Sequence, residues 1–226
     1  MATGVDALAL DGLGLAVADP AASAAFMCGH LGMSELDRAA DRVLVGAGGR
    51  AATLSLIAAQ GPREPGVLGR VILRVADVER AVAALPAGTA VEGDRFELAS
   101  FRGPEGIELG FTLVAGGGID YDVDHIRLRV SDPDATRVAL AQAGFVPRAH
   151  ALHVADKYIA LATSPRPVER SLLHHIGVRV ESVEAVGAEA RARGLEIDDS
   201  EAGEAIGVVL PGPERIRLRF SAQTPR

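Results

Sequence analysis

The chain repeats one short pattern four times, as LAVAD (residues 15–19), LRVAD (73–77), LRVSD (128–132) and VRVES (178–182). In each copy an alternating, strand-like segment is followed by Asp or Ser, residue types that cap helix N-termini through a side-chain oxygen. The pattern recurs about every 55 residues, and such a period indicates copies of one structural unit. We therefore expect four helices, beginning near Asp19, Asp77, Asp132 and Ser182.

The first copy shows the unit in full. Residues 13–17 alternate as a strand, and Asp19-Pro20 starts a helix over residues 21–31 that ends at Gly32. Three short strands are predicted next, at 34–36, 42–45 and 53–58. The unit is β-α-β-β-β, and the other copies span about 68–114, 121–164 and 172–221.

Composition limits the classes of partner. The net charge is −7 and the pI is near 5.4, whereas nonspecific nucleic-acid binding requires a basic surface. No apolar run approaches the roughly 20 residues of a membrane span, and residues 1–11 do not resemble a secretory signal. A single cysteine, Cys28, forms no internal disulfide. We expect a cytoplasmic protein without nucleic-acid or membrane partners.

The glycine-rich stretch at 115–118 separates the second and third units. One β-α-β-β-β unit covers one face of its sheet with its helix, so two units side by side enclose a cavity. We therefore expect an α+β protein in which the four modules form two open barrel-like domains. These are an N-terminal barrel (1–114, modules 1 and 2) and a C-terminal barrel (119–226, modules 3 and 4).

The strand period of two predicts which residues face each cavity. On the first strands these are Gly12, Arg70, His125 and His175; on the last strands they are Ser55, Glu108, Ala160 and Arg217. Val17, Val75, Val130 and Val180 should instead pack under the helices. Arg70 and Glu108 are expected to form a salt bridge; a second anion site is the alternative.

The segments DHIRLRVSDPDA (124–135) and KYIALATSPRPVERSLLHHIGVRV (157–180), with the repeated Asp-Pro helix starts, resemble the vicinal oxygen chelate superfamily. That group includes glyoxalase I, bleomycin-resistance proteins and extradiol dioxygenases. The four-module layout resembles the dioxygenases, in which two His and one Glu hold Fe(II) or Mn(II). The resemblance implies that His125 and His175 are metal ligands facing one another in the C-terminal barrel.

Two positions depart from that pattern. Arg217 stands where the resemblance places the Glu ligand, and Lys157 stands near the position of an acid/base histidine. A guanidinium stays cationic and does not coordinate metal. His150, His153, Tyr158 and Glu181 are alternative third ligands that no spacing argument selects. In the N-terminal barrel Gly12, Ser55 and Arg70 replace three ligand positions, so no metal is expected there.

Arginines recur at cavity positions of the last two modules, and their side chains bind carboxylates and phosphates with two-pronged geometry. The set comprises Arg127, Arg129, Arg179, Arg215, Arg217 and Arg219. One interpretation is an anion pocket formed by Arg127, Arg179 and Arg217. The other interpretation is that the arginines at the strand ends, Arg129, Arg179 and Arg219, reach solvent and pair with surface acids.

The sequence and the resemblance are compatible with two functions. The first is a metal-dependent dioxygenase or lyase using Fe(II) or Mn(II), with His125 and His175 as ligands and Lys157 and Arg217 as catalytic residues. The second is a metal-free protein that binds or sequesters a small anionic molecule. Arg217 favours the metal-free binding protein, whereas a Glu at position 217 would favour the metal-dependent enzyme. A homo-oligomer is compatible with either function.

Overall fold

The computed structural model describes residues 5–48, 51–61, 63–94, 98–113, 120–164, 170–198 and 205–222. The glycine-rich stretch at 115–118 lies outside these ranges. The described chain forms four consecutive β-α-β-β-β modules, as predicted.

The elements of the modules occur in the same order. Module 1 contains β1 (Ala7–Val17), α1 (Pro20–His30), β2 (Ser34–Arg38), β3 (Arg42–Gly46) and β4 (Thr53–Ala58). Module 2 contains β5 (Leu68–Val75), α2 (Val78–Ala83), β6 (Val91–Asp94), β7 (Leu98–Arg102), a 3-10 turn (Pro104–Gly106) and β8 (Glu108–Leu113). Module 3 contains β9 (Val123–Val130), α3 (Pro133–Gln142), β10 (Val146–Arg148), β11 (Ala151–Val154) and β12 (Lys157–Thr163). Module 4 contains β13 (Leu173–Val180), α4 (Val183–Ala192), β14 (Glu196–Asp198), β15 (Ala205–Val209) and β16 (Arg217–Ala222).

All four predicted helix starts are confirmed. Asp19, Asp77 and Asp132 each accept a hydrogen bond at 2.9 Å from the backbone N–H three residues later, and Ser182 does so at 3.1 Å. These bonds satisfy one of the N–H groups that a helix leaves without a partner at its start. None of the described helices is long and apolar enough to cross a membrane.

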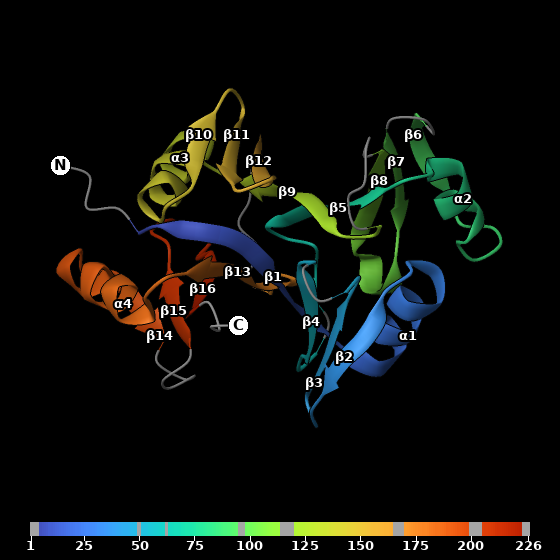
Figure 1. The fold of residues 1–226 in the computed structure, drawn as a ribbon, viewed down its shortest axis with the longest axis horizontal. Coiled ribbons are helices and arrows are strands. Elements are labelled where there is room, and N and C mark those ends of the chain that lie inside the picture. The colour runs from blue at the N-terminus through green and yellow to red at the C-terminus, as the bar shows by residue number, and fades with distance from the viewer. Residues whose placement is uncertain are drawn as a thin grey trace.

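The strands form two open eight-stranded sheets. One sheet has the order β14-β15-β16-β13-β1-β4-β3-β2 and joins modules 1 and 4; we call it the 1/4 sheet. The other has the order β10-β11-β12-β9-β5-β8-β7-β6 and joins modules 2 and 3; we call it the 2/3 sheet. In Figure 1 the 1/4 sheet occupies the lower half of the molecule and the 2/3 sheet the upper half.

This pairing differs from the expected grouping into 1–114 and 119–226. The first strand of module 1 pairs antiparallel with the first strand of module 4, so that Gly14 lies opposite His175. The first strands of modules 2 and 3 pair in the same way, with Ile72 opposite His125. All four first strands offer an equivalent edge, so the repeat does not determine which edges meet.

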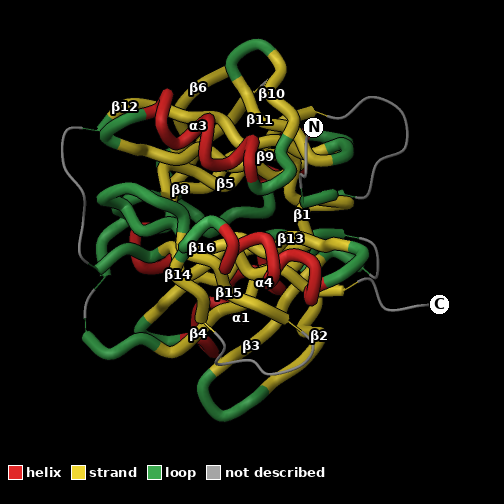
Figure 2. Tube along the Cα trace, turned by 90° about the vertical axis from the view of Figure 1, so that its left-hand side faces the viewer, coloured by secondary structure: helices red, strands yellow, loops and turns green. Residues whose placement is uncertain are grey.

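The hydrophobic core joins all four modules in one continuous cluster. The four valines predicted to pack under the helices belong to it, and each is 2% exposed or less: Val17, Val75, Val130 and Val180. Figure 2 shows α3 on the upper sheet and α4 on the lower sheet at the same side of the molecule. There Arg193 of module 4 donates to the backbone carbonyl of Gln142 at 3.2 Å.

A repeated GPE segment, at 103–105 and 212–214, also connects the two sheets. The Glu105 carboxylate accepts hydrogen bonds from the backbone N–H groups of Ala18 (2.6 Å) and Asp19 (2.8 Å). Glu214 accepts from the N–H of Ser131 at 2.6 Å. Module 2 therefore holds the helix start of module 1, and module 4 holds that of module 3.

Candidate functional site

The 1/4 sheet brings together four of the predicted cavity positions, Gly12, Ser55, His175 and Arg217. The imidazole of His175 lies against the backbone of Gly14, where any side chain would collide with the ring. Glycine at this position therefore makes room for His175. Ser55 and His175 are both buried, at 8% exposed.

His175 is held as a neutral imidazole. Burial, reinforced by the neighbouring His174, Arg219, Arg217 and Arg42, lowers the pKa of His175 to about 3. Its Nδ1 lies 2.9 Å from Nδ1 of His174, a contact that requires one protonated and one unprotonated nitrogen. Strand alternation alone would point His174 to the face opposite His175. The pairing of β1 with β13 is irregular at this point, and the two rings lie in contact.

Three arginines of module 4 are paired with acids of the 1/4 sheet. The ion pairs are Arg217 with Asp198 (2.9 Å), Arg215 with Glu196 (2.6 Å) and Arg179 with Asp11. The side chains of Arg179 and Arg217 are 40% and 35% exposed, so these pairs orient the guanidinium groups more than they stabilise the fold.

A pocket of about 640 Å³ opens beside Arg217; we call it the Arg217 pocket. Its lining residues are Ala16, Arg63, Ser171, Leu173, His174, Val209, Pro213, Glu214, Arg215 and Arg217. They come from the end of β1, the connection between β4 and β5, the start of β13 with the residues just before it, the end of β15, the start of β16, and the connection between β15 and β16. Sequence reasoning missed Arg63, because it lies in a connection where strand alternation predicts no orientation.

His125 lies in the other sheet and contacts different groups. Its Nδ1 is 2.7 Å from Oδ2 of Asp124, and its ring stacks on Tyr158 with 4.3 Å between centroids. His153 stacks on the other side of this group, 5.2 Å from Tyr158. Burial, followed by the charge of Asp124, raises the pKa of the Tyr158 phenol.

The expected contact between Arg70 and Glu108 is confirmed. Their side chains form a salt bridge at 3.6 Å in the 2/3 sheet, and Arg129 approaches the other oxygen of Glu108 at 3.8 Å. Arg127 is exposed and lies opposite Arg70 across β5 and β9. It is thus in a different sheet from Arg179 and Arg217, and of the three Arg217 is the one that lines the Arg217 pocket.

Lys157 lies in a buried ion pair. Its Nζ binds the carboxylate of Asp122 and donates to the carbonyl of Val123 at 2.8 Å. Asp122 also accepts from the backbone N–H of Ala52, in module 1, at 2.8 Å. Lys157 is only 5% exposed. These contacts connect the two sheets, and Asp122 was not singled out by the sequence.

The predicted metal centre does not fit these residues. His125 and His175 were expected to face one another in one barrel, whereas the structure places His125 on β9 of the 2/3 sheet and His175 on β13 of the 1/4 sheet. His175 has Gly12, Ser55 and Arg217 at the neighbouring ligand positions, and none of these supplies a carboxylate. Within the described ranges, no three His, Cys, Asp or Glu side chains are grouped so as to hold a metal ion.

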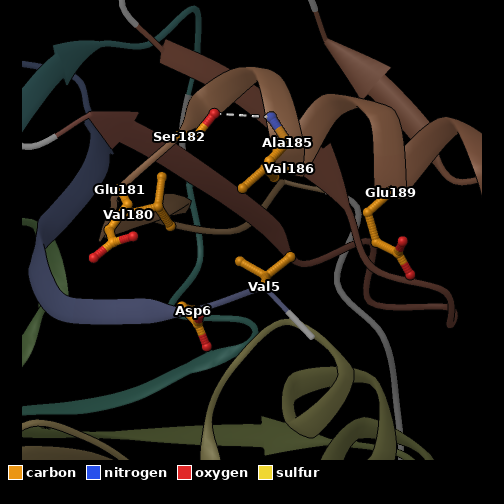
Figure 3. A pocket seen from close by; sticks show the side chains of 8 residues that line it. All are labelled: Val5, Asp6, Val180, Glu181, Ser182, Ala185, Val186 and Glu189. Atoms are coloured by element: carbon orange, nitrogen blue, oxygen red, sulfur yellow. Dashed lines mark hydrogen bonds between the residues drawn. The ribbon is translucent and has the colours of Figure 1, made fainter. Parts of the chain in front are cut away.

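Among the alternative third metal ligands, Glu181 lies away from the Arg217 pocket. Glu181 lines a separate pocket of about 250 Å³ between the start of β1 and the start of α4 (Figure 3). In that view Glu181, Asp6 and Glu189 point in different directions, and the Ser182 hydroxyl caps Ala185. This second pocket is acidic and does not suit an anion.

Residues 9–111 match the family model described as Glyoxalase/Bleomycin resistance protein/Dioxygenase superfamily. The resemblance expected from the sequence is thereby confirmed. A comparison with curated proteins gave no match.

Solved structures share the fold over nearly the whole chain. A candidate dioxygenase from Bacillus subtilis superposes with a TM-score of 0.73 at 16% identity, covering 98% of this chain and 87% of its own. Glyoxalase I from Zea mays gives 0.73 at 14% identity, with coverage of 94% and 92%. The cppA protein of Streptococcus pneumoniae gives 0.65 at 12%, with coverage of 97% and 100%. At these identities the likeness concerns the fold alone.

Proposed function

We propose that this chain, whose residues 9–111 match the model of the glyoxalase/bleomycin resistance protein/dioxygenase superfamily, binds a small anionic molecule in the Arg217 pocket without a resident metal ion. The superfamily fold supports small-molecule binding in a sheet cavity. The residues of this chain favour an anion over a metal at that place, because arginine stands at the position where the family resemblance places a carboxylate ligand.

One observation carries the proposal: three arginines and a histidine line a single pocket of about 640 Å³. That volume is in the range of small-molecule sites. Guanidinium groups bind carboxylates and phosphates through paired hydrogen bonds, which are stronger than bonds between neutral groups. Burial is the main cause of the low pKa of neighbouring His175, and Arg219, Arg217 and Arg42 lower it further.

Ligand titration of the natural protein and an Arg217→Gln variant tests the proposal. Acetate and inorganic phosphate serve as probes, with binding followed by calorimetry. We expect the variant to raise Kd about tenfold, because a charge-assisted hydrogen bond is lost. The control is Arg38→Gln, which removes an equal charge from an exposed pair with Glu35 on β2. Equal anion affinity in all three proteins would contradict the proposal.

A metal-dependent dioxygenase or lyase is the second candidate, favoured by one observation. His125 and Glu108 occupy a first-strand and a last-strand cavity position of the same 2/3 sheet. Glu108 is engaged by Arg70 and Arg129, which oppose a cation there. Metal analysis of protein purified without chelator distinguishes the candidates. Stoichiometric Fe or Mn that is lost in His125→Ala would favour the enzyme.

A further inference from the structure

Arg63 differs from the other arginines of the Arg217 pocket. Arg215 and Arg217 are each paired with a carboxylate of module 4. Among the residues that the structure describes, Arg63 has no ion pair, and its buried Nε has no hydrogen-bond partner. The side chain is half-buried and lines the pocket.

The Arg63 guanidinium is half-buried and partly removed from water without a counter-charge from the described part of the chain. Moving a charged group away from water destabilises the protein unless an opposite charge or hydrogen bonds compensate. An anionic group inside the pocket would supply the opposite charge as well as hydrogen-bond acceptors for the guanidinium. Among the described residues that line the pocket, the one carboxylate is Glu214, and it accepts a hydrogen bond from the backbone N–H of Ser131.

The rest of the lining indicates the shape of the ligand. Four small or aliphatic side chains, Ala16, Leu173, Val209 and Pro213, form the apolar part of the wall. Phe, Tyr and Trp are absent from the described lining, so a flat aromatic ring gains no stacking contact. A short aliphatic group matches this wall.

We propose that Arg63 is the specificity-determining residue of the pocket, and that its ligand class is a carboxylate with a short aliphatic body. The carboxylate binds the guanidinium of Arg63, and the body lies against Leu173 and Val209. This inference rests on the proposed function, because it names the ligand class of the same pocket.

Calorimetric titration with butyrate, benzoate and inorganic phosphate tests the inference, using the natural protein, Arg63→Gln and Arg217→Gln. We expect butyrate to bind more tightly than benzoate or phosphate. Arg63→Gln should raise the Kd for butyrate about tenfold or more. Arg38→Gln again controls for net charge, and an unchanged thermal midpoint confirms that each variant is folded.

The outcomes separate this inference from the proposed function. Butyrate binding that is weakened by Arg217→Gln but unchanged by Arg63→Gln overturns the role of Arg63 and leaves the anion pocket standing. Phosphate or benzoate binding as tightly as butyrate overturns the aliphatic carboxylate class. No binding of any probe to the natural protein overturns both proposals.

Discussion

At the scale of single residues, His175 has the most measurable consequence. Its pKa is lowered from about 6.5 to about 3, whereas the unfolded chain keeps the ordinary value. Below about pH 6.5 the unfolded state therefore binds a proton that the folded state does not, and stability falls as pH falls. Between about pH 7.5 and 5 this contributes a loss of about 2 kcal/mol in unfolding free energy.

Urea unfolding at both pH values checks this prediction in the natural protein and in His175→Gln, which should lose that part of the pH dependence. His150→Gln, at an exposed position, is the matched control and should keep it. Identical pH dependence in all three proteins would show that His175 titrates normally.

The pair Arg70–Glu108 gives a second prediction at this scale. Both side chains are about a quarter exposed, which weakens the pair relative to a fully buried one. Glu108→Ala should lower the unfolding free energy by about 1–2 kcal/mol, because Arg70 and Arg129 lose their acidic partner. The double variant Arg70→Ala/Glu108→Ala should be less destabilised than the sum of the single changes. Strict additivity would show that the pair contributes nothing.

At the scale of elements, the sequence predicted the helix starts and the strand order of each module, because caps and alternation are local signals. The orientation of His174 was not predictable, since it depends on irregular pairing with a distant strand. Nor was the assignment of His125 and His175 to different sheets, which follows from pairing among four equivalent edges. The repeated GPE segment carried a signal that was overlooked: its glutamates connect neighbouring modules.

Removing one of these glutamates tests that connection. Glu105→Ala leaves two N–H groups at the start of α1 without their acceptor, so it should cost about 1 kcal/mol at this exposed site. Hydrogen exchange at Ala18 and Asp19 should accelerate. The control Glu184→Ala removes an exposed carboxylate from the first turn of α4. Equal effects of the two changes would mean a general helix-dipole contribution only.

At the scale of the whole molecule, the buried Lys157–Asp122 pair of the 2/3 sheet is tied to module 1 by the hydrogen bond from the Ala52 N–H to Asp122. Lys157→Ala should lower the unfolding free energy by about 3–5 kcal/mol, since it leaves the Asp122 carboxylate buried without its cation. Denaturant unfolding measures this loss. If stability stays unchanged while ligand affinity or turnover falls, Lys157 acts at a site, as the resemblance implied, and not as a structural residue.

The partnership of the first and last modules also governs how the chain acquires its structure during synthesis. Modules 2 and 3 are neighbours in the sequence, so their sheet can form once residues up to β12 have left the ribosome. Strand β1 must wait for β13, its antiparallel partner, and until then presents an unpaired edge. Such long-range pairing is slow and leaves the nascent chain open to aggregation. A fragment ending at residue 164 should therefore retain the 2/3 sheet while exposing β1 to other chains.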